Sequence, residues 1–547
     1  MTAAAQLDAV ARETAGWLRA TLPDARARGA RLRSDSRLVG AGDIFVAWPG
    51  ANGDGRRHLP QAIAAGAAAV LLEAQGLDAV GVGDAQVVPM LPVPDLRERA
   101  GRIAADWLGS PSTALDVVAV TGTNGKTSCT QWIAAGCNAR ARRAVAGVVG
   151  TLGAGVPVAD GLPHALAARL ADGGTGGLTT PDALALQHLF RDFVDAGIGV
   201  AAIEASSIGL VQGRLEGTRV AVAVMTNLTR DHLDFHGSVE AYADAKARLF
   251  RWPGLKAAVF NLDDPAALAM GRDLAAGVER IGFSVVGSQP APASAANDAV
   301  LRVCGTLPDA RGLVHVSIGA RSAALRLEPI GRFNLSNALA VAGVWHALGW
   351  SFDEIVAGLE SLRPVPGRLQ RVDAPDDGAG ATGGAPGEVA HELPMVVVDY
   401  AHTPDAIANV LATLRDVAQQ RRGRLWCVFG AGGNRDRGKR APMASAAEAG
   451  ADELVLTSDN PRDEDPVAIL DDLCKGLSRP ARLVEPDRRE AIARAIALAA
   501  AGDVVAIAGK GHEDYQEVRG VRTPFSDVQQ AREALGARRE AGGDRGH

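Results

Sequence analysis

The chain has 547 residues, which at about 100 to 200 residues per domain is enough for about three or four domains, so it is not a small stapled scaffold. Acidic residues outnumber basic residues by 63 to 57, and neither sign gathers in a long run, which argues against a nucleic-acid-binding protein. The five cysteines form no CxxC pair, a pattern typical of a reducing compartment rather than of a disulfide framework.

The N-terminal segment contains Asp8 and Glu13 and has no basic stretch followed by an apolar one, so no secretory signal is visible. The longest nearly apolar run, residues 62–72, has 11 residues, whereas a membrane span needs roughly 20. We therefore expect a cytoplasmic protein with neither a membrane nor a nucleic acid as partner. No interface signal is readable, and a monomer is the default expectation.

Lysine is rare in this chain. Of 57 basic residues only six are lysines, at positions 126, 246, 256, 439, 475 and 510. Arginine serves most surface roles but cannot act as a readily deprotonated amine, so the remaining lysines are candidates for chemistry. Lys256 and Lys475 lie in no motif, and we interpret them as chance survivors.

Apolar β-branched runs alternate with alanine-rich helical stretches, which predicts an α/β fold with largely parallel sheets. Glycine and proline punctuate the chain at residues 109–113 and 363–367. These two places predict three domains, at residues 1–112, 113–363 and 364–547.

The last third predicts a doubly wound domain of its own, with a helix from Pro404 and strands at 395–399, 425–429, 453–457 and 503–508. Residues 373–394 are rich in glycine, alanine, proline and acid, which predicts a mobile surface loop. Shorter insertions of the same kind are predicted at 153–177 and 285–298.

The strongest local motif is an apolar strand that runs into a glycine-rich turn and then a helix, at residues 117–127. Gly122 and Gly125 let backbone N–H groups curl around phosphate oxygens, Lys126 supplies a point charge, and the Thr127 hydroxyl is a possible Mg²⁺ ligand. The spacing GxxGKT is shorter than the usual phosphate-loop consensus. The sequence nevertheless predicts a central mononucleotide-binding domain with a phosphate-binding loop.

Two further predicted strands, residues 199–204 and 220–227, end in polar groups. Ligands gather at the carboxyl ends of parallel strands. Glu204 is therefore a candidate Mg²⁺ ligand, and His232 is a candidate ligand for a second ion.

Several motifs resemble the Mur ligases of peptidoglycan synthesis: TGTNGKT (121–127), TTPD (179–182), EASS (204–207), TNLTRDHLDFHGSVEAYADAK (226–246), GRFNLSNALA (331–340) and DYAHTPDA (399–406). Within that family, the diaminopimelate-adding type is resembled by DSRLVGAGDIFVAWPG (35–50), GAGGNRDRGKR (430–440), DNPR (459–462) and GKGHEDYQ (509–516). The resemblance spans nearly the whole chain up to about residue 536.

The resemblance implies an ATP-dependent amide ligase of three domains: an N-terminal domain that binds the UDP-linked substrate, a central ATP-binding domain and a C-terminal Rossmann-like domain that binds the amino acid. The implied reaction adds meso-2,6-diaminopimelate to the D-glutamate of UDP-N-acetylmuramoyl-L-Ala-D-Glu through an acyl phosphate. A carboxylate is a poor acylating agent, which explains the need for ATP. The implied partners are these small molecules.

The resemblance also implies site residues. The phosphate loop contributes Gly122, Thr123, Asn124, Gly125, Lys126 and Thr127 to ATP, together with Asn334, Asn337, Arg368 and Asp399. The implied contacts of the UDP-sugar peptide are Ser36, Thr179, Thr180, Ser206, Gln212 and Arg214. Diaminopimelate is assigned Arg435, Asp459, Asn460, Arg462, Gly509 and Glu513.

Catalysis is assigned to Lys126, Glu204, His232 and Lys246. In the resembling family the counterpart of Lys246 is carbamylated by CO₂, so Thr127, Glu204, His232 and carbamylated Lys246 form the implied Mg²⁺ site. Because the implied ATP residues lie on both sides of Pro364, we expect an ATP site at a domain interface that closes by rotation of the last domain.

The chain departs from the family pattern at Ile208, where many relatives have histidine, and at Asn434, where aspartate is common.

Three alternative functions stay open. A lysine-adding ligase would share every ATP motif and differ only around DNPR. Folate polyglutamylating enzymes resemble the middle domain but lack the first. A noncatalytic nucleotide-binding scaffold is disfavoured by the intact Lys126, Glu204, His232 and Lys246.

Overall fold

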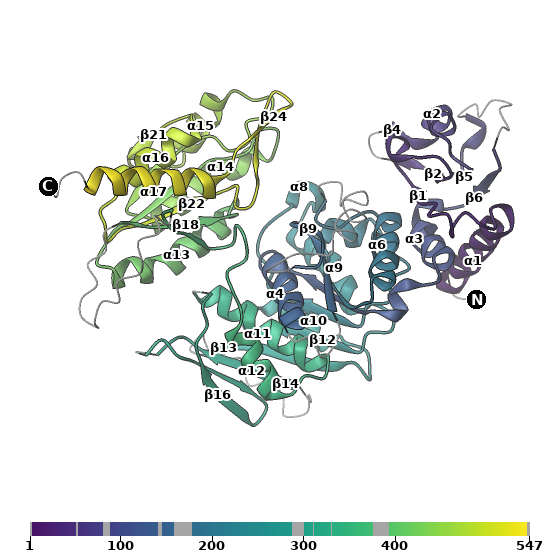
Figure 1. Ribbon diagram of the computed structural model, residues 1–547, viewed down its shortest axis with the longest axis horizontal. Helices are drawn as coiled ribbons and strands as arrows, with labels where there is room; N and C mark the ends of the chain where they lie inside the picture. The colour runs from purple at the N-terminus through teal and green to yellow at the C-terminus, as the bar shows by residue number, and fades with distance from the viewer. Residues whose placement is uncertain are drawn as a thin grey trace.

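The computed structural model describes residues 3–50, 53–79, 88–139, 145–157, 178–286, 300–309, 311–329, 331–375 and 393–543. These residues form three lobes, each built around its own sheet, and the lobe with the largest sheet lies between the other two (Figure 1). Each lobe has two clusters of buried apolar side chains, one on each face of its sheet. Helices pack on these clusters and so cover both faces. The predicted α/β class is confirmed.

The first lobe contains a parallel sheet in the order β1-β2-β5-β6. Strands β2 and β5 are buried at every position, as expected for strands covered on both faces. A small antiparallel ribbon, β3 with β4, projects from the sheet. The elements are α1 (Ala3–Thr21), β1 (Leu32–Arg33), β2 (Ile44–Ala47), β3 (Pro49–Gly50), β4 (Gly53–Asp54), α2 (Leu59–Ala64), β5 (Ala69–Glu73), β6 (Met90–Val93) and α3 (Leu96–Trp107).

The middle lobe contains ten strands in the order β16-β15-β14-β13-β12-β11-β7-β10-β8-β9, and the seven from β14 to β8 are parallel. Strand β7 lies between β10 and β11, so three carboxyl ends meet beside it. The elements that frame this edge are β7 (Asp116–Thr121), α4 (Lys126–Ala139), β8 (Val145–Gly150), β9 (Gly153–Gly155), α6 (Ala183–Asp195), β10 (Ile198–Glu204), α7 (Ser207–Val211), β11 (Val222–Met225), α8 (Leu233–His236) and α9 (Val239–Phe250).

The rest of the middle lobe extends the sheet and covers it. Its elements are β12 (Ala257–Asn261), α10 (Pro265–Arg272), β13 (Glu279–Val286), β14 (Val300–Thr306), β15 (Val314–Ile318), β16 (Arg321–Leu325), α11 (Arg332–Ala347) and α12 (Phe352–Glu360). Helix α11 is buried along most of its length and packs on β13, which brings its N-terminal end to the sheet edge where β7 ends.

The last lobe contains six strands in the order β17-β18-β22-β19-β20-β21, parallel except for β17. Helices α13, α14 and α15 cover one face and α16 and α17 the other, which confirms the predicted doubly wound arrangement. The elements are β17 (Gln370–Val372), β18 (Met395–Asp399), α13 (Pro404–Gln420), β19 (Leu425–Phe429), α14 (Arg440–Gly450), β20 (Glu453–Leu456), α15 (Pro466–Cys474), β21 (Leu483–Val484), α16 (Arg488–Leu498), β22 (Val504–Ala508), β23 (Tyr515–Val518), β24 (Val521–Pro524) and α17 (Asp527–Gly543).

The predicted domain limits at 112/113 and 363/364 stay predictions, and each falls between elements of different sheets. Most of the predicted loop at 373–394 lies outside the described residues, as do most of the insertions at 153–177 and 285–298. The insertion limits were wrong at two ends, because β9 pairs with β8 at residues 153–155 and β13 continues to Val286. Among the described helices, none has the length and apolarity that a membrane span requires.

Candidate active site

The loop between β7 and α4 has the shape of a phosphate-binding loop. Gly122 and Gly125 adopt φ angles of +144° and +88°, which favour glycine. A Cβ atom at Gly122 would lie 1.8 Å from Thr226 Oγ1, and one at Gly125 would lie 2.4 Å from Asn337 Oδ1. Both glycines are therefore required by conformation and by space. Helix α4 begins at Lys126, so its N-terminal N–H groups and positive dipole end face this loop.

The side chain of Lys126 lies across the loop. Its Nζ donates hydrogen bonds to the carbonyl oxygens of Gly122 and Thr123, both at 2.9 Å. Burial lowers the pKa of this ammonium, and the nearby carboxylates of Glu204 and Asp231 oppose that shift. Lys126 is thus a positive charge fixed at the phosphate loop.

Lys246 lies on α9 and is 1% exposed. Its Nζ donates to Gly122 O at 2.8 Å and lies 4.4 Å from the centre of the Tyr242 ring. Burial lowers the pKa of this amine well below its ordinary value, and the positive charge of Lys126 lowers it further. Both effects disfavour the charged form of this amine, which lies against the phosphate loop.

Glu204 ends strand β10 and is 1% exposed, and its carboxylate accepts hydrogen bonds from Thr151 N at 2.8 Å and Thr151 Oγ1 at 3.0 Å. His232 has a φ of 52°, and its Nε2 lies 3.5 Å from Asp231 Oδ2. Burial lowers the pKa of His232, which leaves its ring neutral and able to bind a metal.

The four predicted metal ligands line one cavity of about 290 Å³, beside the phosphate loop: Thr127, Glu204, His232 and Lys246. Within the described ranges, no cluster of three or more His, Cys, Asp or Glu side chains could hold a metal ion by itself. A hydroxyl and a carboxylate are ligands that Mg²⁺ prefers, so the donor set fits this ion. The fit depends on the hydroxyl oxygen of Thr127 and on carbamylation of Lys246, which would add carboxylate-like oxygens to this side chain.

The remaining predicted ATP residues line the same cavity: Asn334, Asn337, Arg368 and Asp399. Arg368 Nη2 donates to Thr127 Oγ1 at 3.3 Å, and the guanidinium lies 4.5 Å from the centre of the Tyr400 ring. Asp399 accepts from Leu369 N at 2.7 Å, while burial raises its pKa. The cavity thus combines the phosphate loop of the middle lobe with groups that follow Pro364.

A second cavity, of about 860 Å³, lies between the middle and last lobes. All six residues predicted to bind diaminopimelate line it: Arg435, Asp459, Asn460, Arg462, Gly509 and Glu513. They follow the carboxyl ends of β19, β20 and β22, where ligands of doubly wound sheets bind.

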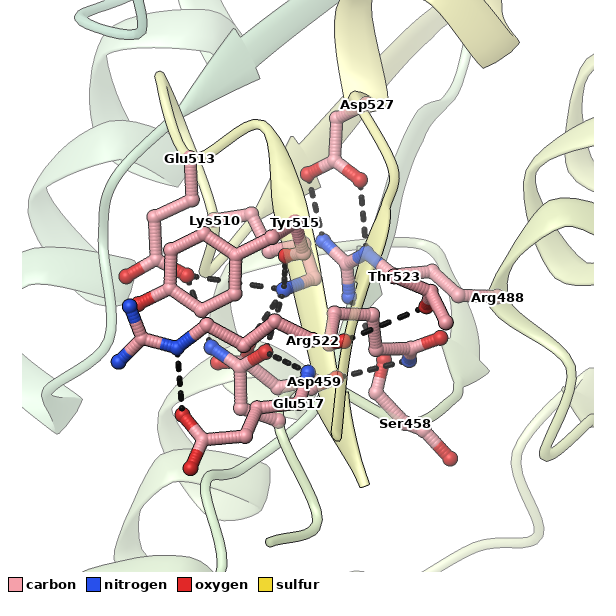
Figure 2. A network of polar contacts seen from close by, with 12 residues as sticks. Ser458, Asp459, Arg488, Lys510, Glu513, Tyr515, Glu517, Arg522, Thr523 and Asp527 are labelled. Carbon is pink, nitrogen blue, oxygen red and sulfur yellow. Dashed lines mark hydrogen bonds and ion pairs between the residues drawn. The ribbon is translucent and has the colours of Figure 1, made fainter. Parts of the chain in front are cut away.

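Two of these six residues are directly bonded, since Asn460 Nδ2 donates to Glu513 Oε2 at 2.8 Å. Figure 2 shows Asp459 and Glu513 beside the ammonium of Lys510. Arg462 has a φ of 53°, and its Nη1 donates to Gly433 O at 2.8 Å. The cavity therefore presents carboxylates, an amide and a guanidinium within one wall.

The predicted sugar-peptide residues are only partly brought together. Thr179, Ser206 and Arg214 line the second cavity. Thr180 is buried, and its Oγ1 donates to Glu204 O at 2.7 Å, which is a structural contact. Gln212 Oε1 accepts from Arg214 Nη2 at 2.6 Å and lines neither cavity.

Ser36 lies in the first lobe, where its Oγ bonds to Gln61 Oε1 at 3.0 Å. Neither cavity includes Ser36 among its lining residues. Its predicted role in binding the UDP-linked substrate stays a prediction.

Sequence reasoning assigned no role to several residues of the site. Asp231, Tyr400 and His402 line both cavities. Lys439 lines the second cavity, and Lys510 lies buried behind it. The scarcity of lysine was the available signal for the last two, since both lie in the motifs that carry the resemblance.

Asn434, the departure at the third-lobe glycine motif, is explained by its contacts. It has a φ of 52°, which asparagine tolerates well. Its Nδ2 donates to Asp463 Oδ2 at 3.0 Å, and its Oδ1 accepts from Asp463 N at 3.2 Å. An aspartate there would accept but not donate, and it would repel Asp463. The other departure, Ile208, lines the second cavity.

Comparisons with known proteins agree with this geometry. Three family descriptions match the chain: "Mur ligase family, catalytic domain" at residues 30–107, "Mur ligase middle domain" at 120–345 and "Mur ligase, glutamate ligase domain" at 388–511. The chain belongs to the Mur ligase family. These matches cover all three lobes, so the family assignment does not depend on the phosphate loop alone.

Individual Mur ligases are similar over nearly the full length. A UDP-N-acetylmuramoyl-L-alanyl-D-glutamate--2,6-diaminopimelate ligase of Acidovorax sp. (strain JS42) is 44% identical, covering 96% of this chain and 97% of that protein. The protein of the same name from Ralstonia nicotianae is 45% identical and covers 95% of each. A solved structure with this name is 37% identical, with a TM-score of 0.58 over 93% of this chain and 95% of that chain.

A MurF ligase from Thermotoga maritima in complex with ADP shares the fold at 18% identity, with a TM-score of 0.57 over 94% of this chain and 98% of that chain. At this identity the likeness concerns the fold alone. It supports the three-lobed Mur ligase architecture that the two cavities require.

Proposed function

We propose that this protein is the ATP-dependent ligase that joins meso-2,6-diaminopimelate to the D-glutamate carboxyl of UDP-N-acetylmuramoyl-L-Ala-D-Glu, forming ADP and phosphate. One observation carries the proposal: the phosphate-loop cavity and the cavity of the amino-acid cluster share lining residues, among them Asp231, Tyr400 and His402. An acyl phosphate formed in the first cavity would thus be open to an amine bound in the second. The names of the similar full-length proteins specify the substrates.

The phosphate-loop residues suit the first step. Transfer of the γ-phosphoryl group places negative charge on the phosphate oxygens, and catalysis of such a step is mainly positioning and electrostatics. Lys126 is a fixed cation at that place, and the N-terminus of α4 faces it. Arg368 reaches the same loop from beyond Pro364.

The metal proposal includes a modified lysine. Mg²⁺, when bound by Thr127, Glu204, His232 and carbamylated Lys246, supplies positive charge against the transferred phosphoryl group. Carbamylation requires a neutral amine, and burial disfavours the charged form of Lys246. The resulting carbamate is anionic, which would replace repulsion from Lys126 by attraction.

Arg462 and its neighbours favour diaminopimelate over lysine. A guanidinium matches the distal carboxylate of diaminopimelate, a group that lysine lacks. A site that leaves such a partner unpaired rejects the shorter analogue by on the order of 10⁴-fold. The lysine-adding alternative predicts no need for a cation at this wall of the cavity.

The remaining parts of the proposal concern the whole chain. The first lobe binds the UDP moiety through Ser36, and rotation of the last lobe closes the ATP cavity against water. The protein acts in the cytoplasm as a monomer, since its proposed substrates are small and both cavities are built from one chain.

The deciding experiment measures amide formation with the UDP-linked dipeptide, ATP and Mg²⁺, supplying either meso-diaminopimelate or L-lysine. We expect product and ADP with diaminopimelate, and a kcat/KM for lysine lower by about 10³-fold or more. Efficient use of lysine would instead support the alternative ligase. ADP release without a longer peptide product would overturn the proposal.

A further inference from the structure

Lys510 is a fully buried cation directly behind the second cavity. Its side chain is 0% exposed, and Nζ donates to Asn460 Oδ1 and to Tyr515 O, each at 2.8 Å. The same Nζ lies 3.5 Å from Asp459 Oδ1 and 3.6 Å from Glu513 Oε2 (Figure 2). One ammonium therefore contacts four residues that line the cavity, without lining it itself.

The other buried cation of this network is already neutralised. Arg488 and Asp527 are both 0% exposed and form a bidentate ion pair, with two bonds of 2.7 Å. Arg488 also donates to Ser458 O at 3.2 Å and Ala508 O at 3.0 Å, which fixes the ends of β20 and β22. Lys510 is thus the buried cation in direct contact with both Asp459 and Glu513.

The carboxylate of Asp459 is buried against the ammonium of Lys510. The residue is 7% exposed, and its Oδ1 is a buried oxygen with no hydrogen-bond partner among the described residues. This oxygen is the one that faces Lys510, so the ion pair with the ammonium is what offsets the cost of burying it. Two carboxylates share this one ammonium, so the pair can also receive the ammonium of a ligand.

We propose that Lys510 is a positioning residue that holds Asp459 and Glu513 in place at the wall of the second cavity, where they receive the ammonium of the incoming amino acid. This inference rests on the proposed function. A lysine suits the place better than an arginine, because a compact ammonium reaches acceptors from several directions whereas a guanidinium donates only in its plane. The scarcity of lysine in the chain accords with this requirement.

Removal of the ammonium has a defined pH signature. Burial and the charge of Asp459 raise the pKa of Glu513, and Lys510 opposes both. Without Lys510 the pKa of Glu513 rises further, so its ionised form is reached only at higher pH. The charged and titratable groups that face Glu513 are Asp459, Lys510, Tyr400, Tyr515 and Arg488.

The test compares Lys510→Met, which removes charge and donors, with Lys510→Gln, which keeps donors but not the charge. We expect both to raise KM for diaminopimelate by about tenfold or more while KM for ATP stays within about twofold. The acid limb of kcat/KM for diaminopimelate should move to higher pH in both variants. Lys475→Met, at a surface lysine bonded to Asp472, is the matched control and should match wild type in each measurement.

An unshifted acid limb, or equal increases in KM for both substrates, would overturn the inference. Wild-type kinetics in Lys510→Gln would also overturn it, because the hydrogen bonds rather than the charge would then suffice. Thermal melting of each variant verifies that it is folded. A wild-type enzyme that does not join diaminopimelate refutes the proposed function instead, so the two failures are distinguishable.

Discussion

At the scale of single residues, Lys246 is a buried amine that lies close to another lysine of the site. A buried amine that donates to Gly122 O and lies near a second ammonium, Lys126, is unfavourable in its charged form. A carbamate would convert this repulsion into attraction and provide oxygens for a metal. These surroundings support the proposed carbamylation, for which an arginine could not substitute.

Lys246→Ala should reduce kcat by about 100-fold or more, since it removes charge stabilisation at the transferred phosphoryl group. Short carboxylates such as formate or acetate should restore part of the rate by replacing the carbamate oxygens. The measurement is ADP release with and without added carboxylate. Lys256→Ala is the control, because Lys256 is exposed and pairs with Asp116. Full activity in the Lys246 variant would refute the role.

Arg462→Ala should affect the amino acid far more than the nucleotide. Arg462 lines the second cavity and not the first, and its Nη1 is anchored on Gly433 O. We expect kcat/KM for diaminopimelate to fall by about 100-fold and KM for ATP to change less than about threefold. Arg437→Ala, at an exposed arginine that pairs with Glu464, is the control. Equal losses for both substrates would show that the arginine is structural.

At the scale of elements, the phosphate loop is shaped by neighbours that are distant in sequence. Thr226 and Asn227 follow β11 and hold the loop, with Asn227 Oδ1 accepting from Asn124 N at 2.9 Å. Asn337 of α11 closes the loop from above Gly125. Residues after β11 and a side chain of α11 therefore hold the phosphate loop, whose N–H groups precede helix α4.

Gly125→Ala tests this packing against backbone strain. Gly125 and Gly254 have similar φ angles of +88° and +79°, but a Cβ at Gly254 meets nothing within 4 Å. Both alanine variants should lose about 1 kcal/mol of stability from the backbone conformation. Only Gly125→Ala should raise KM for ATP, by about tenfold or more, because its methyl group would displace Asn337. Comparable KM values for the two variants would contradict the packing argument.

The local sequence predicted the bounds of a helix or strand well where one strong sequence pattern determines them. Strands 395–399 and 425–429 and the helix from Pro404 are confirmed at those residues, because short buried apolar runs and a proline at a helix start are local signals. The strand predicted at 220–227 is shorter, at Val222–Met225. There the chain leaves the sheet to hold the phosphate loop, which no local pattern indicates.

The candidate site was predictable where a motif carried it, and not where it depends on side-chain contacts across lobes. The resemblance located the linings of both cavities. It did not indicate that His402 lies where the cavities meet, or that Lys510 lies behind Asp459. It also assigned Ser36 of the first lobe, which lines neither cavity, to the UDP-linked substrate, and that assignment stays a prediction.

At the scale of the whole molecule, the first lobe is joined to the middle lobe by polar contacts. Arg31 pairs with Asp192 at 2.9 Å, and Arg102 pairs with Glu216 at 2.7 Å. Between them, Leu32 N donates to the ring of His188 at 2.9 Å. This junction sets where the first lobe stands relative to the two cavities.

His188 should make this junction sensitive to acid. Its Nε2 must be unprotonated to accept from Leu32 N, and burial, with the charges of Arg31 and Arg33 adding to it, lowers its pKa to about 3. The unfolded chain, with an ordinary histidine pKa of about 6.5, binds more protons between pH 6.5 and 3. Stability is therefore full above pH 6.5 and lost as the pH falls, by about 2 kcal/mol at pH 5.

Urea unfolding of wild type and His188→Gln between pH 8 and 5 measures this loss. Glutamine can still accept a hydrogen bond but does not titrate, so the variant should lose less stability over this range than wild type, by about 2 kcal/mol. Comparing the two proteins cancels the titration of carboxylates common to both. His346→Gln, at a partly exposed histidine near Glu279, should follow wild type. Parallel curves for wild type and His188→Gln would show that His188 does not set the acid sensitivity of the junction.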